Sequence, residues 1–245
     1  MLILFTLVTL RLSGLWMGMP VFNRDAVPIR YRVLLIAALA PVLLPIARPE
    51  VLPSGADVFP AMVSEVVIGY AIGLSARLLV SSFQVAGQIM GFQMGLAMAN
   101  IFDPETEDQT SVISSAHLNL VGVLFLLLDG HHLLIHGVAA SYQALPIGAV
   151  LDTGLLAQSL FHSANEMWEM GARIAGPITA LMLLVNVLLG FLNRVIPQLS
   201  IFNVGLPMTV VIGLTALSIA LPGSVAFFLH AWDDFGHQLA SLLAK

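Results

Sequence analysis

The sequence predicts an all-α protein of the integral-membrane type, a bundle of long, proline-broken helical hairpins. Of its 245 residues, 58% are hydrophobic and only 9% are charged, with a mean hydropathy of +0.96. A soluble domain has roughly a quarter of its residues charged. The apolar residues also gather into runs, several of which reach the roughly 20 residues that cross a bilayer as a helix. No internal repeat or linker divides the chain, so we predict one unit over residues 1–245.

Six apolar segments set the expected order of helices. The third, fifth and sixth are long enough for one span each, and the fourth for one span plus a turn. The second is short and holds Pro41 and Pro45, which favours a protein-buried or re-entrant helix. The first carries Arg11 and lacks the pattern of a cleaved signal peptide, so we predict a retained helix. The segments are 2–19, 33–46, 58–80, 117–150, 172–192 and 204–230.

Ionisable residues interrupt the third and fourth segments. Glu65 lies in the third, and Asp129 and His131 lie in the fourth. A charge within an apolar run is costly and is by default a functional candidate. We predict that these three side chains are buried and bonded to neighbouring helices. A metal ion held by Asp129, His132 and His136 is a weaker alternative, because H-E-x-x-H is absent. Proton transfer by Asp129 is another.

A stripe of small residues runs through 84–102. Gly87, Gly91 and Gly95 recur every four residues, so they share one face of a helix. Small residues at this spacing let a second helix approach closely, and taken alone they predict ordinary helix packing. Further pairs at the same spacing are Gly14 with Gly18 and Gly69 with Gly73.

Methionines form a second stripe beside these glycines. Met90, Met94 and Met98 recur at the same interval, and methionine offers a flexible apolar surface. The stripe ends at Ile101 and Phe102, just before an Asp-Pro break and an acidic loop. A flexible apolar surface is suited to sealing against changing partners. We therefore predict that these five residues belong to a moving, sealing segment.

The stretch between the last two apolar segments is polar and holds two prolines. Proline removes a backbone donor and restricts the helix, so the chain must turn here. The amide side chains can supply the missing hydrogen bonds, and the arginine can pair with a partner's carboxylate or face cytoplasmic water. An exposed hairpin turn is the plainer alternative. The predicted turn and assembly motif comprises Asn193, Arg194, Pro197, Gln198, Asn203 and Pro207.

Composition limits the other classes of function. The net charge is −5, and nucleic-acid binding needs a basic patch, so we expect no nucleic-acid partner. There is no cysteine, which excludes disulfides and thiolate metal sites. Neither a G-x-S-x-G motif nor a Walker loop occurs. We therefore expect no enzyme activity, no cofactor and no bound metal.

The polar stretch also carries a resemblance to a known family. "NRVIPQLSIFNVGLP" resembles the N-R-x-x-P-Q-x-x-I-F-x-x-G-x-P signature of the FliR family, which serves flagellar export and, as SctT, virulence type III secretion. One departure is Asp129, where the family usually has asparagine. The supporting stretches, in the family's order over nearly the whole chain, are "RLSGLWMGMPVFNRDAVPIRYRVLL", "EVVIGYAIG", "GQIMGFQMGLAMANIFDP", "DGHHLLI" and "ALPIG".

The resemblance implies a role in protein export. It implies that the chain joins FliP-like and FliQ-like subunits in a helical spiral, the entry channel for unfolded export substrates. The location it implies is the bacterial inner membrane within the flagellar basal body, with FlhB-like and FlhA-like export proteins as further partners. Apolar surface would then pack against these partners as well as membrane lipid, and a plug would lie at Met98 and Ile101. A small secondary transporter with broken helices is the alternative, although no two-fold repeat is visible.

Overall fold

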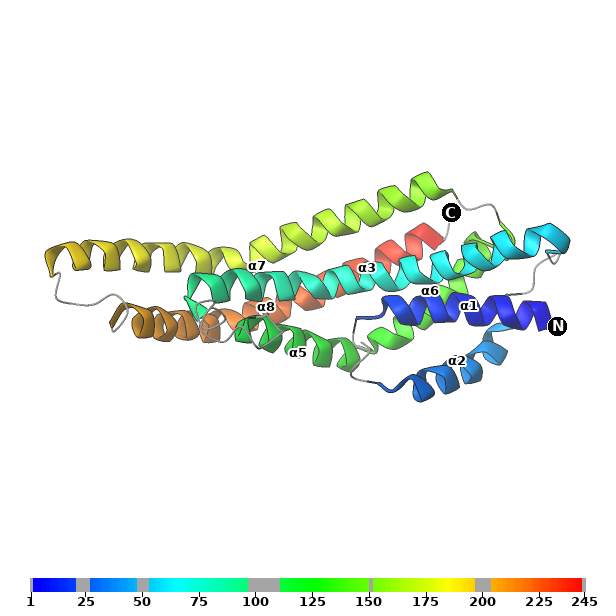
Figure 1. Ribbon diagram of the computed structural model, residues 1–245, viewed down its shortest axis with the longest axis horizontal. Coiled ribbons are helices and arrows are strands. Elements are labelled where there is room, and N and C mark those ends of the chain that lie inside the picture. Colours follow the sequence, from blue (N-terminus) through cyan, green and yellow to red (C-terminus); the bar gives the residue numbers. More distant parts are fainter. Residues whose placement is uncertain are drawn as a thin grey trace. The chain divides into compact units, whose positions relative to one another are not determined.

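The computed structural model describes residues 2–20, 27–47, 53–96, 111–149, 152–196 and 204–243. Within these ranges every element of regular structure is a helix (Figure 1), which confirms the all-α prediction. The elements are α1 (Leu2–Gly18), α2 (Ile29–Leu43), the 3-10 helix η1 (Gly55–Asp57), α3 (Val58–Gln93), α5 (Val112–Leu127), α6 (Gly130–Ala144), α7 (Thr153–Val195) and α8 (Leu206–Leu243).

Three of the described helical stretches are long and apolar enough to cross a membrane. They are α3 together with η1, α7 and α8, which correspond to the third, fifth and sixth apolar segments. α5 and α6 pass the same test only as a pair, and the pair is bent by 63°. The fourth segment is thus a span broken by a turn, or a re-entrant pair. These lengths confirm the predicted membrane-type bundle.

Three prolines lie inside helices rather than at their ends. Pro41, Pro177 and Pro222 are internal to α2, α7 and α8, where each removes one backbone hydrogen bond and favours a kink. α2 continues past its proline as far as Leu43. Only Ala40 and Leu43 of this helix are buried, so the protein-buried helix expected at the second segment is not found within this chain.

Contacts between residues group the chain into two compact units. Unit 1 comprises Met1–Val80, Gly122–Asn165 and Ala231–Lys245, and unit 2 comprises Ser81–Val121 and Glu166–His230. α3, α5, α7 and α8 therefore contribute residues to both units.

In unit 1, the backbones of α1 and α3 come into contact at a point that we call the crossing. A Cβ atom added to Gly14 or Gly18 would overlap the backbone of α3, and one added to Gly69 or Gly73 would overlap the backbone of α1. This approach is what small residues four positions apart permit. Leucines of α1 are fully buried around the crossing: Leu7, Leu12 and Leu15.

In unit 2, residues of α3, α7 and α8 form a separate apolar core. Phe83 of α3 meets Phe228 of α8 edge to face, with ring centroids 5.4 Å apart, a favoured aromatic geometry. Met182 of α7 is fully buried. Gly171 of α7 lies against α3, where an added Cβ would be 3.1 Å from the Ser82 carbonyl oxygen.

Candidate functional site

The described part of the predicted plug is its root at the end of α3. Met90 and Met94 are fully buried. The Met94 carbonyl accepts a hydrogen bond from the Thr209 hydroxyl of α8 at 3.2 Å, and a Cβ on Gly213 would lie 2.5 Å from the Met94 side chain. The root is therefore packed against α8 within unit 2. Three predicted plug residues lie outside the described residues: Met98, Ile101 and Phe102.

Two glycines of the stripe bring α3 and α5 together. A Cβ on Gly87 would lie 2.5 Å from Ser114 Cα, and one on Gly91 would overlap the Ser111 hydroxyl. The Gln88 side-chain oxygen accepts a hydrogen bond from the Ser111 backbone N–H at 3.1 Å. These contacts hold the end of α3 beside the start of α5, which is the close approach that the spacing of these glycines predicts.

The third glycine of the stripe has a different role. Gly95 adopts φ +80°, a left-handed conformation that side chains disfavour. Its N–H donates to the Phe92 carbonyl at 3.1 Å, and an added Cβ would lie 3.4 Å from Leu206 of α8. Gly95 therefore serves a turn just beyond α3, and it does not pack against α5.

The predicted turn motif is only partly described. Asn193 and Arg194 are exposed in the last turn of α7, and Pro207 is exposed at the second position of α8. Proline is tolerated in a first turn because the N–H there has no partner within the helix. The remaining motif residues lie outside the described part of the chain: Pro197, Gln198 and Asn203.

In unit 1, a buried polar cluster joins α1, α3 and α6. Arg11 of α1 donates from Nε and Nη2 to the two carboxylate oxygens of Glu65 in α3, at 2.6 and 2.9 Å. Its Nη1 donates to the Ser141 hydroxyl at 2.9 Å, and Nη2 also donates to the Leu145 carbonyl at 3.0 Å. The guanidinium carbon lies 4.0 Å from the centroid of the Tyr142 ring, within the range of a cation–π contact.

This cluster is closed to water. The side chains of Arg11 and Glu65 are 0% and 1% exposed, and a buried charge is costly unless it is paired and hydrogen-bonded. The bidentate geometry meets this requirement and ties three helices in one register. Glu65 thus lies where its apolar context suggests. The sequence also offered a signal for its partner, because Arg11 stands within an apolar run, but nothing in the sequence pairs two residues 54 positions apart.

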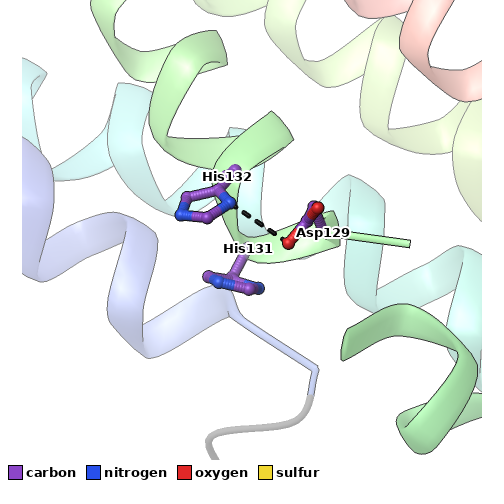
Figure 2. A group of neighbouring side chains, drawn as sticks. All are labelled: Asp129, His131 and His132. Carbon is purple, nitrogen blue, oxygen red and sulfur yellow. Dashed lines mark ion pairs between the residues drawn. The ribbon is translucent and has the colours of Figure 1, made fainter. Parts of the chain in front are cut away.

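Asp129, His131 and His132 gather at the bend between α5 and α6. Asp129 Oδ1 lies 3.3 Å from His132 Nδ1. The imidazole rings of His131 and His132 are tilted by 35° to each other, with centroids 4.2 Å apart. Figure 2 shows the carboxylate beside both rings at the start of α6. One ligand atom from each residue lies within 4.8 Å of the others. The group could hold one divalent ion, with His131 in place of His136.

Asp129 corrects the prediction of a buried carboxylate. Its side chain is 72% exposed and that of His132 is 63% exposed, whereas His131 is half-buried. The reason is local, because the fourth apolar segment is two helices and Asp129 stands at the turn between them, with φ 54°. It occupies the N-cap position of α6 without making a capping hydrogen bond. Structural metal sites are closed by protein ligands, and this exposed group does not have that character.

Residues 2–235 match the family model described as "Bacterial export proteins, family 1". A flagellar biosynthetic protein FliR from Pectobacterium carotovorum subsp. carotovorum is 35% identical over 241 residues, which is 96% of this chain and 90% of the relative. The chain belongs to the FliR family of bacterial export proteins. FliR proteins of Bacillus subtilis and Escherichia coli are each 28% identical, over 89% and 96% of this chain and 85% and 91% of their own lengths.

FliR family membership agrees with the helical content of the chain. The relatives are flagellar biosynthetic proteins, and the described residues supply helices long and apolar enough to lie in a membrane. This is a bacterial export protein of the membrane type.

Proposed function

We propose that this chain is a subunit of the flagellar type III protein export gate. With FliP-like and FliQ-like subunits it forms the entry channel for unfolded export substrates, and flagellum assembly requires it. The channel lies in the bacterial inner membrane within the flagellar basal body, in contact with FlhB-like and FlhA-like export proteins. Its role is to form and close a path, and neither enzymatic chemistry nor a cofactor or metal takes part. The names of the FliR relatives support this assignment.

One observation carries the proposal, namely the apolar surface along α7. Exposed apolar side chains occur in two parts of this helix: an early part with Leu155, Phe161 and Trp168, and a later part from Leu181 to Val195. The exposed ion pair of Glu169 and Arg173 lies between the two parts. The 43 residues of α7 span about 65 Å at 1.5 Å per residue, whereas the hydrocarbon core of a bilayer is about 30 Å thick. Lipid therefore covers only one of the two apolar parts, and partner subunits cover the other.

Co-expression tests the assignment directly. We expect the chain to be degraded or aggregated when it is produced alone, and to be recovered in a complex of defined mass when the FliP-like and FliQ-like proteins are produced with it. Native mass spectrometry of the detergent-extracted complex gives the subunits present. A monodisperse, detergent-stable monomer that gains no partner on co-expression would contradict the proposal.

A closing plug is part of this proposed function. Met98, Ile101 and Phe102 provide its apolar tip, and Met90 and Met94 provide its base. Flexible apolar side chains can move aside for a passing chain and then exclude water again. The buried, hydrogen-bonded root at Met94 supports the proposal, because a plug must be anchored at its base.

Conductance measurements test the plug separately from assembly. We expect Met98→Ala with Ile101→Ala to make the purified complex leak small ions in a planar bilayer, at unchanged subunit composition. Met17→Ala, which alters an exposed methionine at the end of α1, is the control and stays closed. If the complex with the double variant conducts ions no better than the unaltered complex, other residues close the channel.

A further inference from the structure

Two arginines lie well inside apolar helices of unit 1, and their surroundings differ. Arg11 is fully buried and its guanidinium is satisfied within the chain. Arg77 of α3 is exposed, and its side chain makes no ion pair or hydrogen bond with the other residues that the structure describes. Its neighbours in sequence are apolar, with Ala76 before it and Leu78, Leu79 and Val80 after it. A cation in such a position is a functional candidate that needs an anionic partner.

Arg77 belongs to an open face of α3. Phe59, Val63 and Tyr70 precede it at spacings of 4, 7 and 7 residues, and they are 73%, 48% and 37% exposed. Residues at these intervals share one face of a helix. The opposite face is buried in the core of unit 1: Ala61, Ile68, Ile72 and Leu79. We call Phe59, Val63, Tyr70 and Arg77 the open face.

The spacing and chemistry of the open face fit another helix. Steps of four and seven residues are those of a helix–helix seam, and the face is about 27 Å long at 1.5 Å per residue. Aromatic residues and arginine are also the residue types enriched in protein interfaces. A lipid phosphate could form an ion pair with Arg77 only where a bilayer surface crosses α3 at that residue. A carboxylate on a neighbouring helix can form this ion pair at any depth.

We propose that the open face docks an apolar helix of one partner subunit of the gate, and that Arg77 forms an ion pair with a carboxylate on that helix. This inference rests on the proposed function, because it requires a partner subunit. A covered guanidinium left without its carboxylate is costly, so the pair also restricts which helix and which register fit.

Charge substitution in the co-expressed complex tests the pairing. We expect Arg77→Glu to retain roughly 10- to 100-fold less partner per chain, because two carboxylates would then face each other in a covered interface. Arg77→Lys keeps the charge, so it retains most of the partner. Arg30→Glu makes the same change of charge at an exposed position in the first turn of α2, and we expect it to be unchanged. Equal retention by Arg77→Glu and Arg30→Glu would overturn the inference.

Crosslinking identifies the occupant in the intact complex. With p-benzoylphenylalanine in place of Tyr70, we expect adducts to one helix of a partner subunit that contains an aspartate or glutamate. Exchanging that acid for arginine should then restore partner retention to Arg77→Glu. Adducts only to lipid, to an export substrate or to a second copy of this chain would overturn the inference, as would the absence of any adduct. Failure of the unaltered chain to bind partners would instead refute the proposed function, and this inference with it.

Discussion

α1 and α3 meet with almost no side chain between them, whereas α7 and α8 leave most of their apolar residues uncovered. In the most apolar stretch of α3 half of the residues are buried, against 17% in α7 and 11% in α8. The crossing of α1 and α3 is lined by glycines and closed by a buried ion pair. The later part of α7, in unit 2, exposes a series of large aliphatic and aromatic side chains: Leu183, Leu184, Val187, Leu188 and Phe191.

The difference separates what the chain satisfies by itself from what it leaves to its surroundings. At the crossing, the charged groups of Arg11 and Glu65 have their partners within the chain, so changes there should reduce the stability of the chain itself. α7 and α8 expose more apolar surface than a soluble monomer usually does. Substitutions on this surface should therefore weaken the association of the chain with lipid or partners. Substitutions at the crossing should therefore lower the stability of the chain, and substitutions on the exposed surface of α7 and α8 should lower its binding to lipid or partners.

The largest effect is expected from breaking the ion pair at the crossing. Arg11→Met leaves the Glu65 carboxylate buried without its cation, which costs about 3–5 kcal/mol of unfolding free energy. Changing both residues, to Arg11→Met with Glu65→Met, removes the uncompensated charge and should recover most of that loss. Thermal unfolding of the detergent-extracted complex gives the comparison. A double variant less stable than either single variant would show that the pair is not the main contribution of these residues.

A smaller loss is expected from filling the glycine contact. The added methyl group of Gly69→Ala would overlap the Arg11 carbonyl oxygen, and such overpacking costs roughly 1–3 kcal/mol. The matched control is Gly122→Ala in α5, where a Cβ has nothing within 4 Å and alanine favours the helix by up to about 1 kcal/mol. The two variants should thus move the unfolding temperature in opposite directions. Equal shifts would mean that the crossing relaxes without cost.

Local patterns predicted the helices well because each pattern depends on one element. Apolar runs of sufficient length predicted α3, α7 and α8, and the spacing of Gly87 and Gly91 predicted the close approach of another helix, which in the structure is α5. The pairing of Arg11 with Glu65 depends instead on how α1 crosses α3, and on α6 bringing Ser141 to the same point. No spacing in the sequence encodes that meeting.

For Asp129, the apolar pattern of the segment was correct, but the prediction that its side chain is buried was wrong. The run 117–150 is apolar on average, so an acid within it was expected inside the bundle. The run contains a 63° bend, and Asp129 occupies the turn. A mean over the run cannot register one left-handed residue, although the Asp-Gly dipeptide is itself a turn signal.

Substitutions on the exposed surface of α7 should reduce partner binding and leave the stability of the chain nearly unchanged, in contrast to substitutions at the crossing. Leu184 and Leu188 are 57% and 58% exposed, so Leu184→Ala with Leu188→Ala should change the stability of the chain by no more than about 0.5 kcal/mol per site. We expect partner retention in the co-expressed complex to fall. Met182→Ala is the contrasting variant in the same helix, since Met182 is fully buried and its loss costs about 2–5 kcal/mol. Normal retention by the leucine variant would mean that lipid covers this part of α7.

The smallest effect is expected at the bend between α5 and α6, which is neither tightly packed nor apolar. Asp129 adopts a left-handed conformation, which asparagine tolerates as well as aspartate and alanine tolerates less well. Asp129→Asn should therefore leave assembly, export and unfolding temperature nearly unchanged, whereas Asp129→Ala should cost roughly 1 kcal/mol. Motility of a complemented deletion strain and metal analysis of the washed complex provide the measurements. Stoichiometric zinc that disappears in Asp129→Asn would make the group in Figure 2 a metal site. Lost export with normal assembly and no metal would instead assign the carboxylate a role in proton transfer.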